Sequence, residues 1–230
     1  MAALSKGAMG AVGAASGTSL AALGAYKFLI QDESKSITSL LASKNPNKRR
    51  LVKSDSGEES SWQASWLQYR KDFHSGDKNP FSLTWTKETT PASTKAPSEF
   101  MSACETQGTK MVKDVESQDY QLFLKYCTRD TLMSDLVSEN PRKQALTKEN
   151  AESSNADWVA VWKEYKTANP YSAGQKGQWE LSDWEGKHNS EKVPLSFMTK
   201  CESELNKPYF NIEGSDYRRV ISWCTKDAPT

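Results

Sequence analysis

Histidine is scarce in this sequence, and it contains neither a Cys-x-x-Cys pair nor a glycine-rich phosphate loop after a strand pattern. The two histidines, His74 and His188, lie in polar stretches typical of surface loops. A catalytic cysteine needs a base beside it, and a zinc site needs several histidine or cysteine ligands. We therefore expect no catalytic residue, no metal site and no bound cofactor, and we predict that the protein is not an enzyme.

The sequence also has no large excess of either positive or negative residues. The chain has 30 Lys and Arg against 29 Asp and Glu, so its formal net charge is +1. Binding to nucleic acid phosphates requires a concentration of positive charge. The one basic cluster, residues 44–50, corresponds to the mixed residues 139–145 further along the chain. We expect no nucleic acid partner.

Long hydrophobic runs are absent except near the N-terminus. Residues 7–26 are uncharged and rich in Gly and Ala, with Lys6 before them and Lys27 after. A helix of this length, at about 1.5 Å per residue, spans the hydrocarbon layer of roughly 30 Å. The sequence predicts a single N-terminal membrane span that contacts the lipid bilayer through residues 7–30. The two alternatives are a signal peptide that is cleaved and a flexible cytosolic tail.

The orientation of this span is a conflict between two patterns. Lys27, Lys35 and Lys44 follow the segment, and the positive-inside bias would keep the rest of the chain in the cytoplasm. The export pattern of a first helix and the cysteines favour the outside. We give these more weight, and predict a cell-membrane protein with an extracellular body, or a secreted one if the leader is cleaved.

From about residue 36 onward the chain repeats itself at a spacing of 95 to 97 residues. The first occurrence contains Leu41, Asn45, Pro46, Trp62, Trp66, Tyr69, Phe100, Met101, Cys104, Tyr120 and Cys127, and the second contains Leu136, Asn140, Pro141, Trp158, Trp162, Tyr165, Phe197, Met198, Cys201, Tyr217 and Cys224. This period exceeds the roughly 20 to 50 residues of solenoid units. We predict a leader and short linker over 1–35, a first repeat over 36–130 and a second over 131–230.

Comparison of the two repeats decides between helix and strand over residues 120–127. Alternation would place Tyr120, Leu122, Leu124 and Tyr126 on one face, but the equivalent set in the second repeat includes Arg219. The helical spacing i, i+3, i+4, i+7 is apolar in both repeats. The sequence therefore predicts a helix here.

The same spacing predicts the other helices. Trp62, Trp66 and Tyr69 form one helical stripe, repeated by Trp158, Trp162 and Tyr165, with Ser61 and Asp157 as N-caps. Further helices are expected near Ile37–Leu41 and Leu132–Val137, and after Pro97 and Pro194, with exposed loops over 54–60 and 149–156. The fold class is all-α: two tandem homologous small helical domains after an N-terminal hydrophobic helix.

The four cysteines are two pairs with the same separation of 23 residues: Cys104 with Cys127, and Cys201 with Cys224. An antiparallel helical hairpin brings the start of one helix to the end of the next, within the roughly 4.4–6.8 Å between Cα atoms that a disulfide requires. Such a loop closure stabilises a domain by about 3.5 kcal/mol. We predict these two disulfides. The alternative is four reduced thiols in the core.

Two other chemistries are alternatives. The first is an aromatic platform of Trp62, Trp66 and Tyr69, with Trp85, that binds a glycan or peptide. The second is a hydrolase that uses the repeated carboxylates, which are Glu105, Glu202, Asp119, Asp216, Asp130 and Asp227. Rings at helical spacing are more often core, and carboxylates at helix ends are more often caps or dipole partners.

The motifs Trp158-Val-Ala-Val-Trp162-Lys-Glu-Tyr165, Phe197-Met-Thr-Lys-Cys201 and Tyr217-Arg-Arg-Val-Ile-Ser-Trp223-Cys224 follow a Gly/Ala-rich leader. This arrangement resembles the paralogous uncharacterised proteins of haemotropic mycoplasmas. The resemblance covers nearly the whole chain and brings no catalytic or binding residue with it. It implies a large family of surface antigens that varies the face shown to a host. We expect surface display, with antigenic variation or adhesion to a host surface ligand as the role.

Overall fold

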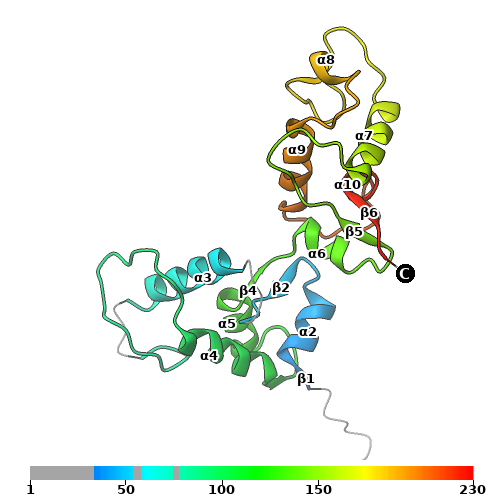
Figure 1. Ribbon diagram of the computed structural model, residues 1–230. Helices are drawn as coiled ribbons and strands as arrows, with labels where there is room; N and C mark the ends of the chain where they lie inside the picture. The colour runs from blue at the N-terminus through cyan, green and yellow to red at the C-terminus, as the bar shows by residue number, and fades with distance from the viewer. Residues whose placement is uncertain (1–33, 54–57, 75–77, 230) are drawn as a thin grey trace, which may run out of the picture. The chain divides into compact units, whose positions relative to one another are not determined.

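Nine helices and three two-stranded antiparallel sheets make up the described residues, which are 34–53, 58–74 and 78–229 of the computed structural model (Figure 1). From Lys35 onward these residues belong to one compact unit. The segment 7–30, predicted to enter the bilayer as a hydrophobic helix, lies outside the described residues. Within the described ranges, no helix combines the length and the apolar character needed to cross a membrane.

In the first half of the compact unit, residues 35–130, the helix α5 packs against both α3 and α4 (Figure 1). Its elements in chain order are β1 (Lys35–Ser36), α2 (Ile37–Lys44), β2 (Lys48–Arg50), α3 (Glu59–Asp72), α4 (Ser98–Thr109), β3 (Met111–Val112), α5 (Gln118–Tyr126) and β4 (Thr128–Asp130).

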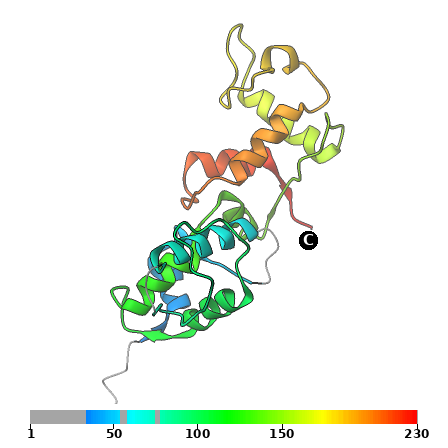
Figure 2. The same cartoon turned by 90° about the vertical axis from the view of Figure 1, so that its left-hand side faces the viewer.

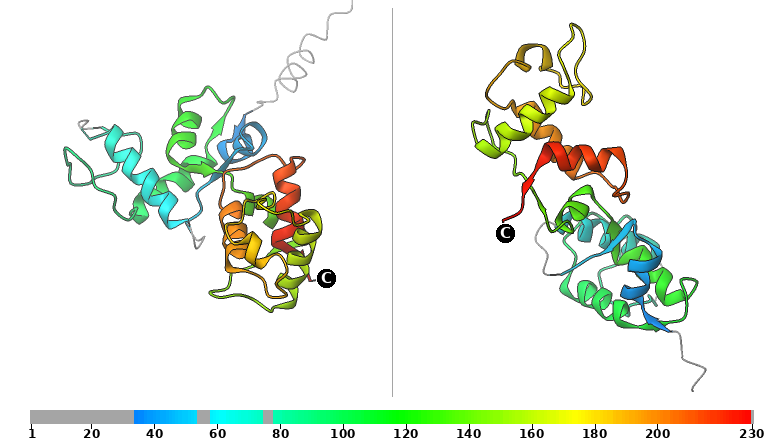
Figure 3. Two further views of the ribbon diagram at one scale, coloured as in Figure 1. Left: turned by 90° about the horizontal axis from the view of Figure 1, so that it is seen from above. Right: turned by 90° about the vertical axis from the view of Figure 1, so that its right-hand side faces the viewer.

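The second half, residues 131–229, repeats this order without the first strand pair and with one additional short helix, α8. Its elements are α6 (Met133–Ser138), β5 (Lys143–Ala145), α7 (Ala156–Ala168), α8 (Trp184–Lys187), α9 (Leu195–Leu205), α10 (Ser215–Cys224) and β6 (Thr225–Asp227). The orange α9 and the red α10 lie side by side in Figure 2, and α10 also packs against α7, as the left view of Figure 3 shows.

The helical prediction is confirmed where the two repeats were compared. Residues 118–126 form α5, which buries Tyr120, Phe123 and Tyr126. The equivalent α10 buries Val220 and Trp223. Spacings of three residues place these side chains on one face of each helix, as expected from its 3.6-residue period.

The two predicted N-caps are wrong. The helix α3 begins at Glu59, with Glu58 as its N-cap residue, and not after Ser61. The helix α7 begins at Ala156 because the side chain of Asn155 accepts a hydrogen bond from the backbone N–H of Asp157. Asparagine is among the strongest N-cap residues, so it starts the helix before Asp157 is reached.

The all-α prediction left out three short strand pairs. In the first half β2 pairs with β4, so that Lys48 faces Asp130, and in the second half β5 pairs with β6, so that Lys143 faces Asp227. Strands of two or three residues are too short for apolar alternation to reveal them. Each of these two pairs, β2–β4 and β5–β6, joins the segment after the first helix of its half to the segment after the last helix.

Two hydrophobic cores lie in the unit, one in each half. The first core contains Ile37, Leu40, Leu41, Leu51, Trp62, Trp66, Tyr69, Ala96, Phe100, Cys104, Val112, Tyr120, Phe123, Tyr126 and Cys127. The second core contains Met133, Val137, Leu146, Trp158, Val161, Trp162, Tyr165, Trp179, Leu181, Trp184, Val193, Phe197, Met198, Cys201, Leu205, Val220, Trp223 and Cys224. Aromatic residues are the largest fully buried side chains of both.

The ring geometry of the two cores is closely similar. Trp66 stacks on Tyr69 with ring centroids 6.0 Å apart, and Trp162 stacks on Tyr165 at 5.6 Å. The edge of a further ring meets each tyrosine: Tyr126 at 5.1 Å from Tyr69, and Trp223 at 5.0 Å from Tyr165. Edge-to-face contacts of this kind add to the burial of apolar area.

For one matched pair of residues, the match in the structure differs by one position from the match in the sequence. The sequence spacing matches Leu41 with Leu136, whereas α2 buries Ile37, Leu40 and Leu41 and α6 has Met133, Leu136 and Val137 as its buried residues. The buried faces therefore correspond at a spacing of 96, which matches Leu40 with Leu136. The chain is one residue shorter between this face and Asn140 than between its counterpart and Asn45.

Candidate functional site

Each core is closed by one disulfide. The structure joins Cys104 to Cys127 with Cα atoms 5.3 Å apart, and Cys201 to Cys224 with Cα atoms 5.4 Å apart. Both distances fall within the usual range for disulfides. Cys104 lies in the middle of α4 and not near its start, and Cys127 is the C-cap residue of α5. The redox state of the cysteines in the cell stays a prediction.

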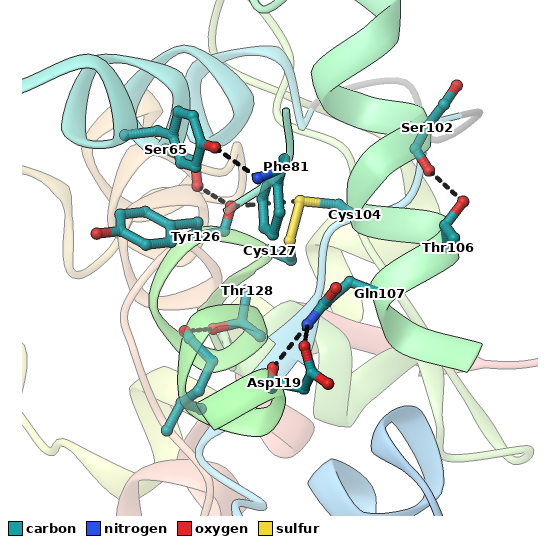
Figure 4. The surroundings of a disulfide bond; sticks show 12 residues. Ser65, Phe81, Ser102, Cys104, Thr106, Gln107, Asp119, Tyr126, Cys127 and Thr128 are labelled. Atoms are coloured by element: carbon teal, nitrogen blue, oxygen red, sulfur yellow. Dashed lines mark hydrogen bonds between the residues drawn. A yellow bond between two sulfur atoms is a disulfide. The ribbon is translucent and has the colours of Figure 1, made fainter. Parts of the chain in front are cut away.

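Polar contacts of the backbone surround the first disulfide (Figure 4). The carbonyl oxygen of Tyr126 lies 3.6 Å from Cys104 Sγ and accepts a hydrogen bond from Ser65 Oγ. One turn further along α4, Gln107 Nε2 donates to the Asp119 carboxylate at 2.7 Å. These contacts tie α3, α4 and α5 together around the covalent link.

The aromatic stripe predicted as an alternative binding platform is buried. Trp62 is 3% exposed, Trp66 is 4% exposed and Tyr69 is fully buried. Trp85, which is partly buried, packs edge-on against Trp66 with ring centroids 5.6 Å apart. A ring needs a free face to stack on a sugar or a peptide, so the platform interpretation is wrong for these residues.

The buried tyrosines of the stripe are held by their hydroxyl groups. Tyr69 donates to Asn79 Oδ1 at 2.5 Å and accepts from the N–H of Phe81 at 3.0 Å. Burial raises the pKa of Tyr69 to about 12. Tyr165 accepts from the N–H of Trp179 at 3.3 Å, and burial raises its pKa as well. Both groups stay neutral at physiological pH, which suits structural residues.

The repeated carboxylates are bound by separate cations. Asp119 accepts from Lys110 at 2.8 Å, and the hydrogen bonds from Lys110 and Gln107 lower its pKa. Asp130 pairs with Lys48 at 2.7 Å, and Asp227 pairs with Lys143 at 2.8 Å. The remaining members lie elsewhere: Asp216 pairs with Arg219, Glu202 pairs with Lys148, and Glu105 is exposed. Five of the six repeated acids therefore form ion pairs, each with a different cation.

Both histidines donate from Nδ1 to a backbone carbonyl oxygen at the end of a helix. His74 Nδ1 lies 2.8 Å from the carbonyl oxygen of Lys71, and His188 Nδ1 lies 2.9 Å from that of Glu185. The ring of His188 also stacks on Tyr171 with centroids 3.8 Å apart. Across the described ranges, no group of three or more His, Cys, Asp and Glu side chains is arranged to hold a metal ion.

The junction between the halves contains a charged cluster that sequence reasoning missed. Arg129 Nε donates to Glu58 at 2.7 Å, and the two Nη atoms donate to Asp135 at 2.6 and 2.9 Å. Glu58 lies within the predicted exposed loop over 54–60, yet it is only 7% exposed. Because its other carboxylate oxygen accepts from the N–H of Val52, the carboxylate is held inside. Residues 54–57 of that loop lie outside the described residues.

The predicted exposed loop over 149–156 is exposed at six of its eight residues, and Ser153 is its one buried residue. Ser153 is 1% exposed and pairs with Val193 through two backbone hydrogen bonds of 3.0 and 2.8 Å. The N–H of Asn155 donates to the hydroxyl of Ser153. A backbone bridge buries this serine, a contact between distant segments that local polarity does not indicate.

Each half has a groove between its first long helix, its last helix and the adjacent strand pair, and each groove has a volume of about 390 Å³. The first groove is lined by Lys48, Ser61, Ala64, Ser65, Gln68, Lys125, Thr128, Arg129, Asp130, Leu132 and Pro208. The second groove is lined by Lys143, Asp157, Ala160, Val161, Glu164, Ile221, Ser222, Thr225, Lys226 and Asp227. Most positions of the second groove match positions of the first at a spacing of 95 to 97.

Comparisons of the chain with family models, with curated proteins and with solved structures gave no match. The resemblance to paralogous proteins of haemotropic mycoplasmas therefore stays a prediction from the motifs.

Proposed function

We propose that this protein is a tandem-repeat surface protein, anchored in the cell membrane through residues 7–30, with its folded body outside the cell. Residues 1–35 are the anchor and a short linker, and 36–130 and 131–230 are two homologous helical domains. The body presents a changeable helical surface, used for antigenic variation or for adhesion to a host surface ligand. No catalytic activity is part of this function.

The two disulfides are the observation that supports display outside the cell. Disulfides form and persist in oxidising compartments and are rare in the cytosol. All four cysteines are paired, and each pair lies inside a core. A reducing compartment would remove about 3.5 kcal/mol of stabilisation from each small domain. We therefore give the cysteines more weight than Lys27, Lys35 and Lys44, whose charge favours the opposite orientation.

The division between interior and surface supports antigenic variation. The ring clusters of the two cores share their geometry, whereas exposed positions at equivalent places differ. In the loop between α9 and α10, Phe210 is 58% exposed and Ile212 is 60% exposed. At the matching positions the loop between α4 and α5 has the exposed Lys113, and Val115, which is partly buried against the first core. A constant core under a changing surface is what variation of a displayed face requires.

Protease treatment of intact cells tests this proposal. Cells that express the full chain are treated with protease before and after permeabilisation, and the body is followed with an antibody. We expect the body to be lost from intact cells while a cytosolic marker in the same sample survives. Recovery of the body from the medium instead indicates a cleaved leader. Full protection in intact cells, with digestion only after permeabilisation, contradicts surface display.

A further inference from the structure

We propose that copies of this protein associate head to tail, with the β1–β3 edge of one chain against the second groove of the next. This inference goes beyond surface display, and it rests on the proposal that the two halves are copies of one unit. Within one chain the Leu132–Pro208 bridge of the second half lines the first groove. The second groove and the Ser36–Met111 pair are the equivalents of these two surfaces, and the chain itself leaves both uncovered.

Thr131 connects the halves and is almost fully buried. Its N–H donates to the carbonyl oxygen of Asn47 at 2.9 Å, and its hydroxyl donates to that of Pro46 at 2.8 Å. Its own carbonyl oxygen accepts from the N–H of Tyr209 at 2.8 Å. One residue further on, Leu132 pairs with Pro208 in an antiparallel bridge. This bridge, from the second half, forms one wall of the first groove.

The second groove has no such wall. Its lining comes from the second half alone, and it ends at Asp227. Ala160 lies on its floor at the position of Ala64 in the first groove, and both alanines are exposed. Both grooves have a volume of about 390 Å³.

The β1–β3 sheet of the first half contains the equivalent of the Leu132–Pro208 bridge. Ser36 pairs with Met111 in the β1–β3 sheet, and the N–H of Ile37 donates to the carbonyl oxygen of Lys110 at 2.9 Å. In the second half the N–H of Met133 donates to the carbonyl oxygen of Lys207, also at 2.9 Å. Met111 corresponds to Pro208, and it is 62% exposed. An exposed methionine is an adaptable apolar contact.

The charges around the two surfaces are compatible with this association. Lys226 takes the position of Arg129 in the second groove and already pairs with Asp157 at 3.0 Å. In the proposed contact the neighbouring chain has Ser39 at the position that Asp135 occupies beside the first groove. The two positions are equivalent because the buried faces of α2 and α6 correspond at a spacing of 96. Arginine and aspartate have both been replaced, so no charge is buried without a partner.

Charge does not select the orientation of the contact. The second groove has three carboxylates, Asp157, Glu164 and Asp227, against the two ammonium groups of Lys143 and Lys226. At the edge around Met111, Lys110 pairs with Asp119 at 2.8 Å and Asp114 follows Lys113. The orientation follows instead from the equivalence of the Ser36–Met111 pair with the Leu132–Pro208 bridge. A contact between two different surfaces of identical chains builds open chains or rings and not symmetric pairs.

Cross-linking of single-cysteine variants tests the contact. All four native cysteines are in disulfides, so a thiol introduced by Met111→Cys or Ala160→Cys is the reactive one. Full-length Met111→Cys and Ala160→Cys chains are mixed in mild detergent with a short bis-maleimide. We expect a cross-linked dimer from the mixture and little from either variant alone. Ala168→Cys, an exposed position on the same helix α7 outside the groove, is the matched control.

A mixing experiment by sedimentation adds a second readout. Met111→Glu removes the apolar contact, and Ala160→Arg fills the groove; both positions are exposed, so both variants are expected to fold. The unmodified chain should form species larger than dimers, each variant alone should be monomeric, and their mixture should recover dimers only. Ile212→Glu controls for an exposed apolar residue elsewhere. Chains that stay monomeric, or a dimer of Met111→Cys with itself, overturn the head-to-tail contact without touching the protease result on surface display.

Discussion

The guanidinium of Arg129 donates two parallel hydrogen bonds to the carboxylate of Asp135, at 2.6 and 2.9 Å, across the boundary predicted between the repeats. The side chains of both residues are 18% exposed, and that of Glu58, the second carboxylate on Arg129, is 8% exposed. This cluster stabilises the junction because bidentate ion pairs shielded from water are stronger and more specific than exposed ones. It has no counterpart at the end of the second half, where Lys226 pairs with Asp157.

Substitution of the acid should therefore destabilise the body. Asp135→Asn removes the charged partner from both Nη atoms, and we expect a loss of about 2 to 3 kcal/mol in the free energy of unfolding. Urea denaturation followed by circular dichroism measures this loss. Glu139→Gln is the matched control, because Glu139 pairs with Arg49 but its side chain is 58% exposed. That control should change stability by less than about 1 kcal/mol. Equal effects of the two substitutions contradict a special role for the Arg129 cluster.

The same carboxyl predicts a dependence on pH. Burial by itself would raise the pKa of Asp135, but hydrogen bonds from Arg129 and from the N–H of Leu132 hold that pKa below its ordinary value. A carboxyl whose pKa falls on folding stabilises the protein above its unfolded pKa of about 4, and this contribution is lost as the pH falls through the folded pKa. The stability difference between the unmodified chain and Asp135→Asn should shrink below about pH 4.

Urea midpoints measured from neutral to acid pH check this prediction. The unmodified chain should approach the Asp135→Asn variant as the pH falls. Asp119, whose pKa is lowered by Lys110 and Gln107, contributes to acid sensitivity in both proteins and so cancels in the difference. A difference that stays constant down to the lowest pH would show that Asp135 does not supply it.

Removal of either disulfide should cost a similar amount of stability. Replacement of Cys104 and Cys127 by alanine opens a loop of the same length as replacement of Cys201 and Cys224, since both pairs have a separation of 23 residues. We expect each double variant to lose about 3.5 kcal/mol. Denaturation by urea, with and without reducing agent, measures the loss. Mass spectrometry without reduction should find these two links in freshly isolated protein, and four alkylatable thiols would rule them out.

The helices were predictable because two versions of one pattern were available. Arg219 excluded the strand interpretation of residues 120–127, and the stripe of Trp62, Trp66 and Tyr69 was found from its spacing alone. The cysteine pairs were found in the same way. These features depend on local spacing, which the sequence contains directly.

The strand pairs and the junction cluster depend on contacts between distant residues. Lys48 and Asp130 meet across 82 residues, and Arg129 meets Glu58 across 71 residues. A lysine in a basic run and a glutamate in a polar loop look like surface residues, and local polarity predicted them as such. Only the repeated spacing of the Lys48–Asp130 and Lys143–Asp227 pairs contained a signal for their pairing. Glu58 has no charged counterpart in the second half, so its pairing with Arg129 could not be predicted from the repeat.

The strand pairs place the entry of each half beside its exit. Lys48 faces Asp130 in one half, and Lys143 faces Asp227 in the other. The residue after each entering strand is a leucine: the N–H of Leu51 donates to the carbonyl oxygen of Cys127, and that of Leu146 to the carbonyl oxygen of Cys224, both at 2.9 Å. Recombination that fuses the beginning of one half to the end of the other would therefore keep a lysine opposite an aspartate in the same register. Genes built on this plan can gain or lose whole modules, and exchange segments between them, without a new closing element for each product.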